Sequence, residues 1–249
     1  NLQEETATTW TVGTQITPSF LPGFALSVDY YNIEIDDAIN AVGAQDIVDN
    51  CVDSATIANG FCDLIDRNPA TGGFTFLRQT SVNFARQETS GIEAQAVYRF
   101  GLGPVDLTLA ASGTWVEKLN NFFDPADPTL VDPELGELQR PEWAGRASIT
   151  ADYEAFSFTW STTYLDKMGL RSVEIETVGN TGTDTYSFAN GIADETFIHN
   201  ISFSYELNDM FDIYGGVNNV FDKKPFVTEQ AYPVSPVGTL FFLGATVSM

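Results

Sequence analysis

Long segments in which apolar and polar residues alternate recur along this chain of 249 residues. The segment 156–164 reads FSFTWSTTY, so aromatic residues occupy every second position until Thr162, with serines and threonines between them. Because successive side chains of a strand point to opposite faces, this pattern predicts strands with one apolar and one polar face. The same alternation is found in four further segments, 92–100, 105–115, 143–154 and 197–206.

The strands predicted in this way are numerous and long. With 5–17, 23–36, 211–221 and 238–249 they amount to about nine, and several exceed ten residues. Strands of globular proteins usually have about five or six residues, whereas a tilted strand that crosses a bilayer needs about 9–11. No run of about 18 consecutive apolar residues is present, so a transmembrane helix is excluded. The pattern therefore favours an all-β fold, a transmembrane antiparallel β-barrel.

The connections between these strands alternate between short and long. The short ones are Pro18–Gly23, Gly101–Pro104, Tyr153–Phe156 and Glu206–Phe211, and the long ones lie near 37–85, 122–140, 171–194 and 222–237. Short turns on the periplasmic side and long loops outside are typical of outer-membrane barrels. This places Met249 in the periplasm and, counting back through nine strands, Asn1 outside. An odd number of strands cannot close a bacterial barrel, so we expect one arc of a larger one.

Charge limits the class of partner. The formal net charge is −23, from 34 acidic against 11 basic residues, so nucleic acid is not expected as a partner. The ranges 34–66 and 124–137 together hold thirteen Asp or Glu and no Lys or Arg. We interpret them as solvated loops; capture of divalent cations is the alternative, although no calcium-loop motif is present.

The two cysteines, Cys51 and Cys62, have ten residues between them. No further Cys or His lies close enough to complete a zinc site, so a local disulfide in an oxidising compartment is predicted, the alternative being two free thiols. The segment 43–66 around them also predicts a short helix.

Residues that carry chemistry are scarce. The single histidine, His199, falls on an apolar strand face near the membrane interface, and no nucleophile, phosphate-binding or dinucleotide motif is present. The acidic pairs Asp36–Asp37 and Asp194–Glu195 are interpreted as loop charges. We therefore predict no enzyme activity, no metal site and no cofactor.

Four segments resemble one protein family when they are taken in order. They are SVDYYNIEIDDAI (27–39), ETSGIEAQAVYRF (88–100), GVNNVFDKKP (216–225) and the terminal GTLFFLGATVSM (238–249). In this order they resemble the C-terminal part of TonB-dependent outer-membrane receptors. The cysteine segment 50–73 resembles an extracellular loop of the same family. The final Met249 departs from the family, which usually ends in an aromatic residue.

The resemblance implies a 22-stranded barrel plugged by an N-terminal domain. Such receptors import a scarce nutrient, for example an iron chelate, a vitamin or a saccharide, and are driven by an inner-membrane TonB complex. The implied partners are outer-membrane lipid, the plug, the remaining strands and a small nutrient ligand. No plug is found in this chain, so two explanations are open. The receptor is made or nicked as two chains, or this sequence is one part of a longer receptor chain. The range 37–85 is expected to form an extracellular loop insert.

Two groups of residues are candidates for contact with ligand or plug. The loop aromatics Tyr186, Phe188, Phe226 and Tyr232 are predicted to stack on substrate. The wall residues Glu93, Arg99, Arg146 and Asp152 are predicted to face the lumen and plug. Two other functions remain open, a passive substrate-selective porin and a secreted adhesin or carbohydrate-binding β-protein.

The stretch GVNNVFDKKP contains one residue that the alternation does not explain. Val217 is expected to face lipid and Asn218 the lumen, while Phe221 joins the outer aromatic girdle. Strict alternation then places Asn219 on the lipid face, where an amide is costly. A bulge at this position or a location at the interface would account for it.

Overall fold

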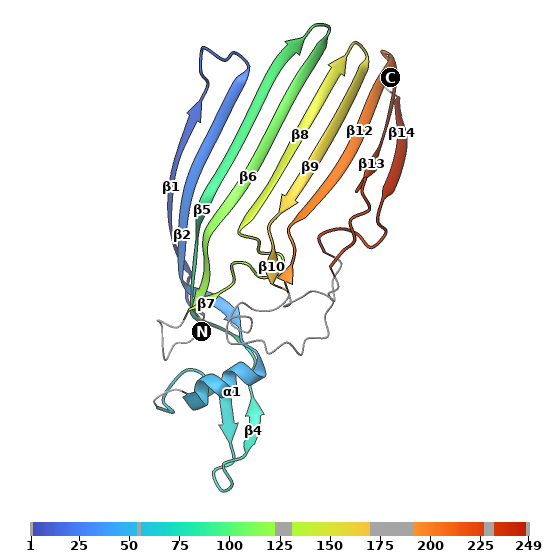
Figure 1. The fold of residues 1–249 in the computed structure, drawn as a ribbon. Helices are drawn as coiled ribbons and strands as arrows, with labels where there is room; N and C mark the ends of the chain where they lie inside the picture. The colour runs from blue at the N-terminus through green and yellow to red at the C-terminus, as the bar shows by residue number, and fades with distance from the viewer. Residues whose placement is uncertain (1, 54–55, 123–130, 170–191, 227–231, 248–249) are drawn as a thin grey trace. The chain divides into compact units, whose positions relative to one another are not determined.

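The computed structural model describes residues 2–53, 56–122, 131–169, 192–226 and 232–247. In these residues the main sheet follows a path of nine long strands in chain order, which confirms the predicted number (Figure 1). They are β1 (Thr6–Ile16), β2 (Phe24–Ala41), β5 (Ser81–Leu102), β6 (Val105–Phe122), β8 (Trp143–Tyr153), β9 (Phe156–Leu165), β12 (Thr196–Asn208), β13 (Phe211–Asn218) and β14 (Leu240–Val247). The short β7 (Asp132–Pro133) pairs with β6 off this path.

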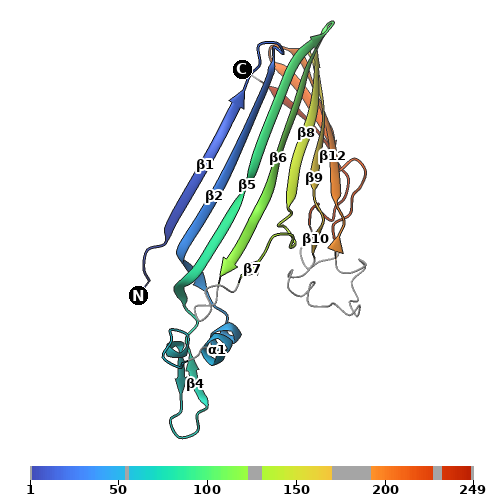
Figure 2. The ribbon, with the colours of Figure 1, turned by 60° about the vertical axis from the view of Figure 1, so that its left-hand side comes forward.

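The sheet is an antiparallel meander from β6 onward. Each pair from β6–β8 to β13–β14 is antiparallel, with one register shift in these pairs, between Glu206 and Asn208 of β12 where it meets β13. Figure 2 shows β6, β8, β9 and β12 side by side in this order. The hairpins β5–β6, β8–β9 and β12–β13 are each closed by two residues, whereas long segments follow β6, β9 and β13. The predicted sorting of short and long connections is therefore present in this part of the chain.

Strand β2 continues past the point where the alternation ends. The sequence pattern placed its end near residue 36, but the strand runs to Ala41 although Asp37 has a left-handed φ of 54°. The side-chain Nδ2 of Asn83 donates to the backbone carbonyl oxygens of Asp37, at 2.7 Å, and Gln3, at 3.0 Å. These bonds hold the backbone in line across the irregular residue, so the strand persists where its side-chain pattern does not.

A small subdomain forms between β2 and β5. It contains α1 (Ala44–Asp53), the 3₁₀ turn η1 (Cys62–Leu64) and the hairpin β3 (Ile65–Arg67) and β4 (Phe74–Leu77). Ile47, Cys51, Phe61 and Ile65 are its buried core. The predicted short helix is thus present. No helix in the described residues has the length and hydropathy needed to cross a membrane.

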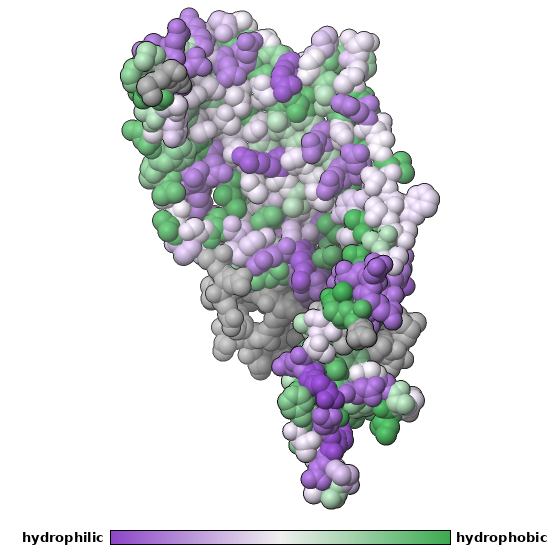
Figure 3. Space-filling view, turned by 180° about the vertical axis from the view of Figure 1, so that it is seen from behind, coloured by the Kyte–Doolittle hydropathy of each residue, from purple (hydrophilic) through white to green (hydrophobic). Residues whose placement is uncertain are grey.

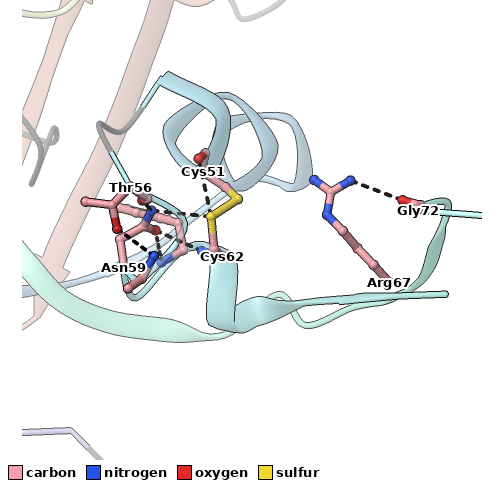
Figure 4. Close-up of a disulfide and its surroundings, with 8 residues drawn as sticks. Cys51, Thr56, Asn59, Cys62, Arg67 and Gly72 are labelled. Carbon is pink, nitrogen blue, oxygen red and sulfur yellow. Dashed lines mark hydrogen bonds between the residues drawn. A yellow bond between two sulfur atoms is a disulfide. The ribbon is translucent and has the colours of Figure 1, made fainter. Parts of the chain in front are cut away.

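The disulfide between Cys51 and Cys62 joins α1 to η1 (Figure 4). The Asn59 side chain organises the turn, because its Oδ1 accepts hydrogen bonds from the amides of Phe61 and Cys62 at 3.0 and 2.9 Å. Its Nδ2 donates to the carbonyl of Thr56 at 2.7 Å. The subdomain therefore has its own core, cross-link and capped turn.

A second small cluster forms among the connections of the later strands. The bridge β10 (Met168–Gly169) pairs with β11 (Ile192–Ala193). Met168 and Ala193 are buried with Phe226, and Leu138, Leu165 and Tyr232 pack around them. This cluster orders parts of three long connections beside one another.

Candidate functional site

The sheet has two chemically different faces, and the strand register keeps them continuous. Leu109, Ile149, Trp160 and Ile201 are successive cross-strand partners from β6 to β12. One position along, Thr108, Thr150, Thr159 and Ser202 form the corresponding row on the opposite face. The alternation read from single strands is therefore in phase across the sheet.

The apolar face is exposed rather than packed as a core. Ile149 is 53% exposed, Phe241 74% and Leu243 76%, and all three lie on this face. A soluble protein rarely leaves a contiguous apolar surface of this kind open to water. The described residues hold no layer that covers this face of β8–β14, so an apolar medium is the environment it fits.

Aromatic side chains mark both ends of the apolar face. Trp115 and Trp143 pair at a ring separation of 5.9 Å near the long connections, and the Trp115 indole donates to Glu142 at 3.0 Å. At the hairpin end, Tyr153 and Phe156 are cross-strand partners. From Trp143 to Tyr153 the strand advances about 33 Å, or about 25 Å of membrane thickness at a tilt of about 40°. That equals the height of the apolar band of outer-membrane barrels.

His199 lies on the apolar face near the end of the strands that joins the long connections, among aromatic side chains. Its Nδ1 is 2.8 Å from the Thr162 hydroxyl and accepts a hydrogen bond from the Trp160 indole at 3.3 Å. The Phe221 ring meets the imidazole edge to face, at 5.0 Å. These contacts give the histidine a packing role at the end of the strand.

The polar face is hollowed in two places where small residues line it. One hollow, of about 300 Å³, is bordered by Glu93, Gln95, Ser112, Thr114 and Arg146, with Gly113 and Gly145 among its lining. A Cβ at Gly145 would lie 3.0 Å from the Ser112 carbonyl oxygen, so the glycine allows the close approach of β6 and β8. In Figure 3, hydrophilic residues (purple) and residues of intermediate hydropathy (white) extend along the sheet, with hydrophobic residues (green) scattered among them.

The four wall residues predicted from the sequence are on strands as expected. Arg146 pairs in register with Ser112, and Asp152 with Asp106, so both share the face of the hydroxyl residues. Glu93 borders the same hollow as Arg146. Among the described residues none of Glu93, Arg99, Arg146 and Asp152 has a side-chain hydrogen bond or ion pair. Their contact with a plug stays a prediction.

The second hollow was not anticipated from the sequence. It has a volume of about 260 Å³ and is lined by Ser157, Thr159, Ser202, Phe203, Ser204, Tyr214, Gly215 and Phe242. Tyr214 and Gly244 are cross-strand partners, as are Phe242 and Gly216, and each ring leans over its glycine. Large and small residues facing each other would have been the signal, but it is readable only once the register is known.

The predicted loop aromatics have different surroundings. Phe226 is only 6% exposed and packs in the cluster with Met168, while its amide donates to the Tyr232 carbonyl at 2.7 Å. Partial burial raises the pKa of the Tyr232 phenol above its ordinary value of 10.0. Tyr186 and Phe188 lie outside the described residues. Substrate stacking by any of the four stays a prediction.

Asn219 resolves the irregularity in GVNNVFDKKP. Strand β13 ends at Asn218, and Asn219 has a left-handed φ of 54°. The residue is 6% exposed, and its side-chain Oδ1 accepts a hydrogen bond from the backbone amide of Lys223. Its own backbone amide donates to Oδ1 of Asn200 at 2.8 Å. The residue therefore ends the strand as a turn cap, and neither a bulge nor an unpaired amide on the lipid face is present.

No group of three or more His, Cys, Asp or Glu side chains that could hold a metal ion occurs among those the structure describes. The antiparallel meander, the exposed apolar face with aromatic ends and the hollowed polar face together define the wall of a transmembrane β-barrel.

The chain belongs to a known family of such barrels. Residues 1–220 match the family described as TonB dependent receptor-like, beta-barrel, as the sequence segments had indicated. That match covers most of the chain, so these strands belong to a TonB-dependent receptor barrel. Among curated protein sequences none matches this chain.

Solved structures agree on the fold. The FrpB iron transporter from Neisseria meningitidis aligns with 99% of this chain at 16% identity and a TM-score of 0.57. A ferric enterobactin receptor variant from Pseudomonas aeruginosa, PfeA R480A in complex with enterobactin, aligns with 98% at 13% identity and a TM-score of 0.61. The copper transporter OprC aligns with 100% at 15% identity and a TM-score of 0.58. The chain spans 31 to 32% of the length of these three proteins.

Proposed function

We propose that the protein containing this chain imports a scarce nutrient across the bacterial outer membrane by TonB-dependent transport. The observation that carries this proposal is the two-faced sheet in a chain of the TonB-dependent receptor family. An apolar face of membrane height supports lipid contact, and a polar face with charged and hollowed regions supports a hydrated lumen. An iron chelate is the first candidate substrate, because the similar structures include iron and siderophore receptors.

The proposed orientation follows from the connections. The two-residue hairpins that close β5–β6, β8–β9 and β12–β13 would face the periplasm, and the long connections would face outward. The disulfide subdomain between β2 and β5 would then be extracellular, where disulfides persist. The end of β14 would lie on the periplasmic side.

The proposed plug contact involves the charged part of the polar face. Glu93 and Arg146 border one hollow and have no partner among the described residues. Charges enclosed in a barrel lumen need compensating charges or hydrogen bonds. A plug domain from the rest of the receptor would supply them, and the TonB complex would act through that plug.

Uptake by cells tests the proposal. Deleting the gene should abolish import of the receptor's iron chelate under iron limitation, as measured with ⁵⁵Fe-labelled chelates drawn from the main siderophore classes. Deleting the TonB complex, or collapsing the proton gradient with a protonophore, should abolish the same uptake. Uptake that persists without TonB would favour a passive porin. A chain released from membranes as a soluble monomer would favour the secreted adhesin.

A further inference from the structure

The polar face is divided into a charged part and a part lined by hydroxyl groups. We call Ser148, Thr150, Ser157, Thr159, Ser202 and Ser204 the hydroxyl tract. Register places them on one face of β8, β9 and β12, with Thr150 opposite Thr159 and Thr159 opposite Ser202. Arg146 and Asp152 flank the tract on β8, and no charged residue lies between them on this face.

The tract has free hydrogen-bonding capacity. Thr150 and Thr159 bond to each other, at 2.9 Å between the hydroxyl oxygens. The hydroxyls of Ser157, Ser202 and Ser204 have no hydrogen-bond partner within the described residues. All three residues are partly exposed and line the 260 Å³ hollow. A hydroxyl can both donate and accept a hydrogen bond, so this surface can bond to water or to an uncharged polar molecule without reorganising.

Two aromatic rings border the tract on β13 and β14. Tyr214 is 44% exposed and leans over Gly244, while Phe242 is 38% exposed and leans over Gly216. A ring that lies over a glycine leaves its other face available for a ligand. Rings beside hydroxyls form a surface that suits flat or polyhydroxylated uncharged groups.

Passage through a lumen needs several weak contacts rather than one strong one. Binding must be favourable enough for entry and weak enough for release. Short, uncharged hydroxyl side chains meet this requirement better than Glu93 and Arg146, whose charges would hold a partner firmly. The two parts of the wall therefore suit two different tasks.

We infer that the hydroxyl tract is the water-lined side of the lumen, along which an uncharged hydrogen-bonding ligand, or the uncharged part of a larger one, moves past the plug. This inference rests on the proposed function. It differs from that function in assigning the passage to β8, β9 and β12 rather than to the whole circumference.

Thiol accessibility in the full-length receptor tests the inference. Thr159→Cys and Ser202→Cys, whose cross-strand partners on this face are uncharged, would be labelled in isolated outer membranes with cationic, anionic and neutral methanethiosulfonate reagents of similar size. Each rate is divided by that of the reagent with free cysteine. Glu93→Cys reports the charged hollow, Ile149→Cys reports the lipid face, and the unsubstituted receptor gives the background.

The tract cysteines should react at comparable normalised rates with all three reagents, within about threefold, because an uncharged surface does not concentrate either ion. Glu93→Cys should react at least about tenfold more slowly, since a plug packed against it excludes the reagent. Tract cysteines as slow as Glu93→Cys would mean that the plug covers the tract, and the inference would be wrong. Fast labelling of Ile149→Cys by the charged reagents would instead overturn the barrel assignment itself.

Discussion

Asn219 and Lys223 are joined by two hydrogen bonds that close the turn after β13. The Asn219 side-chain Nδ2 donates to the Lys223 carbonyl and its Oδ1 accepts from the Lys223 amide, both at 2.8 Å. The Thr239 hydroxyl donates to the Asn219 carbonyl at 2.8 Å. One asparagine thereby connects the end of β13 with the residue that precedes β14.

Asn219→Ala should destabilise the full-length protein by about 2–3 kcal/mol, because two side-chain bonds are lost and alanine is strained at a positive φ. Asn219→Gly loses the same bonds but fits the backbone, so it should cost about 1 kcal/mol less. Unfolding in urea, with the receptor reconstituted in lipid, measures both. Equal stabilities for the alanine and glycine variants would contradict the role of the left-handed backbone.

Gly244→Ala should destabilise the β13–β14 pair by about 1–3 kcal/mol, since the added methyl group overlaps the Tyr214 ring. Tyr214→Ala in the same chain should relieve part of this cost, giving a coupling free energy in a double-mutant cycle. Gly60→Ala is the control, because nothing lies within 4 Å of a Cβ at that position. Additive effects of the two substitutions would show that the ring does not occupy the space above the glycine.

Replacing Cys51 and Cys62 by alanine should destabilise the subdomain between β2 and β5 while leaving the barrel strands intact. Its core of Ile47, Phe61 and Ile65 is small, and losing a cross-link of this loop length costs about 2–3 kcal/mol in the chain-entropy model. Limited proteolysis of the intact receptor should then cut within residues 42–80. Reductant should have the same effect on the unsubstituted protein. Cleavage within β8 or β9 at a similar rate would contradict a local effect.

Acid should loosen the turn that holds Asp222. The hydrogen bond from Lys224, at 2.7 Å, lowers the pKa of the Asp222 carboxyl below its ordinary value of 3.8. A lowered pKa stabilises the folded turn above the ordinary pKa, and this stabilisation is lost as pH falls through the folded value. Hydrogen-exchange protection of residues 219–226 should therefore be constant above about pH 5 and fall below it, as pH drops through 3.8 and then through the lower folded value. Asp222→Asn should show a smaller change, and an unchanged pH response would contradict the account.

Much of the fold can be predicted from local pattern, and several particular features cannot. The alternation in 156–164 places Trp160 and Thr159 on opposite faces, and the spacing of Cys51 and Cys62 predicts their disulfide. The continuation of β2 past Asp37 depends on Asn83, which is distant in sequence. The turn made by Asn219 depends in the same way on Asn200 and Thr239.

The candidate site was also predictable only in part, because some of its features depend on residues that are distant in sequence. Arg146 and Asp152 could be assigned to the polar face from β8 alone. Phe226 was predicted to be available for ligand contact, but it is buried by Met168 and Ala193, which come from the connection between β9 and β12. The hollow beside Tyr214 depends on which glycine each aromatic faces, and that follows from strand register rather than from any single segment.

The central claim is that one face of the sheet contacts lipid and the other lines a hydrated lumen. Nitroxide labels at each position from 147 to 152 of the full-length receptor in bilayers test it most directly. Positions 147, 149 and 151 should be relaxed by oxygen, which concentrates in lipid, and positions 148, 150 and 152 should not. This period of two follows from the register of β8 with β6 and β9. Uniform accessibility along the segment, or the opposite phase, would contradict the account.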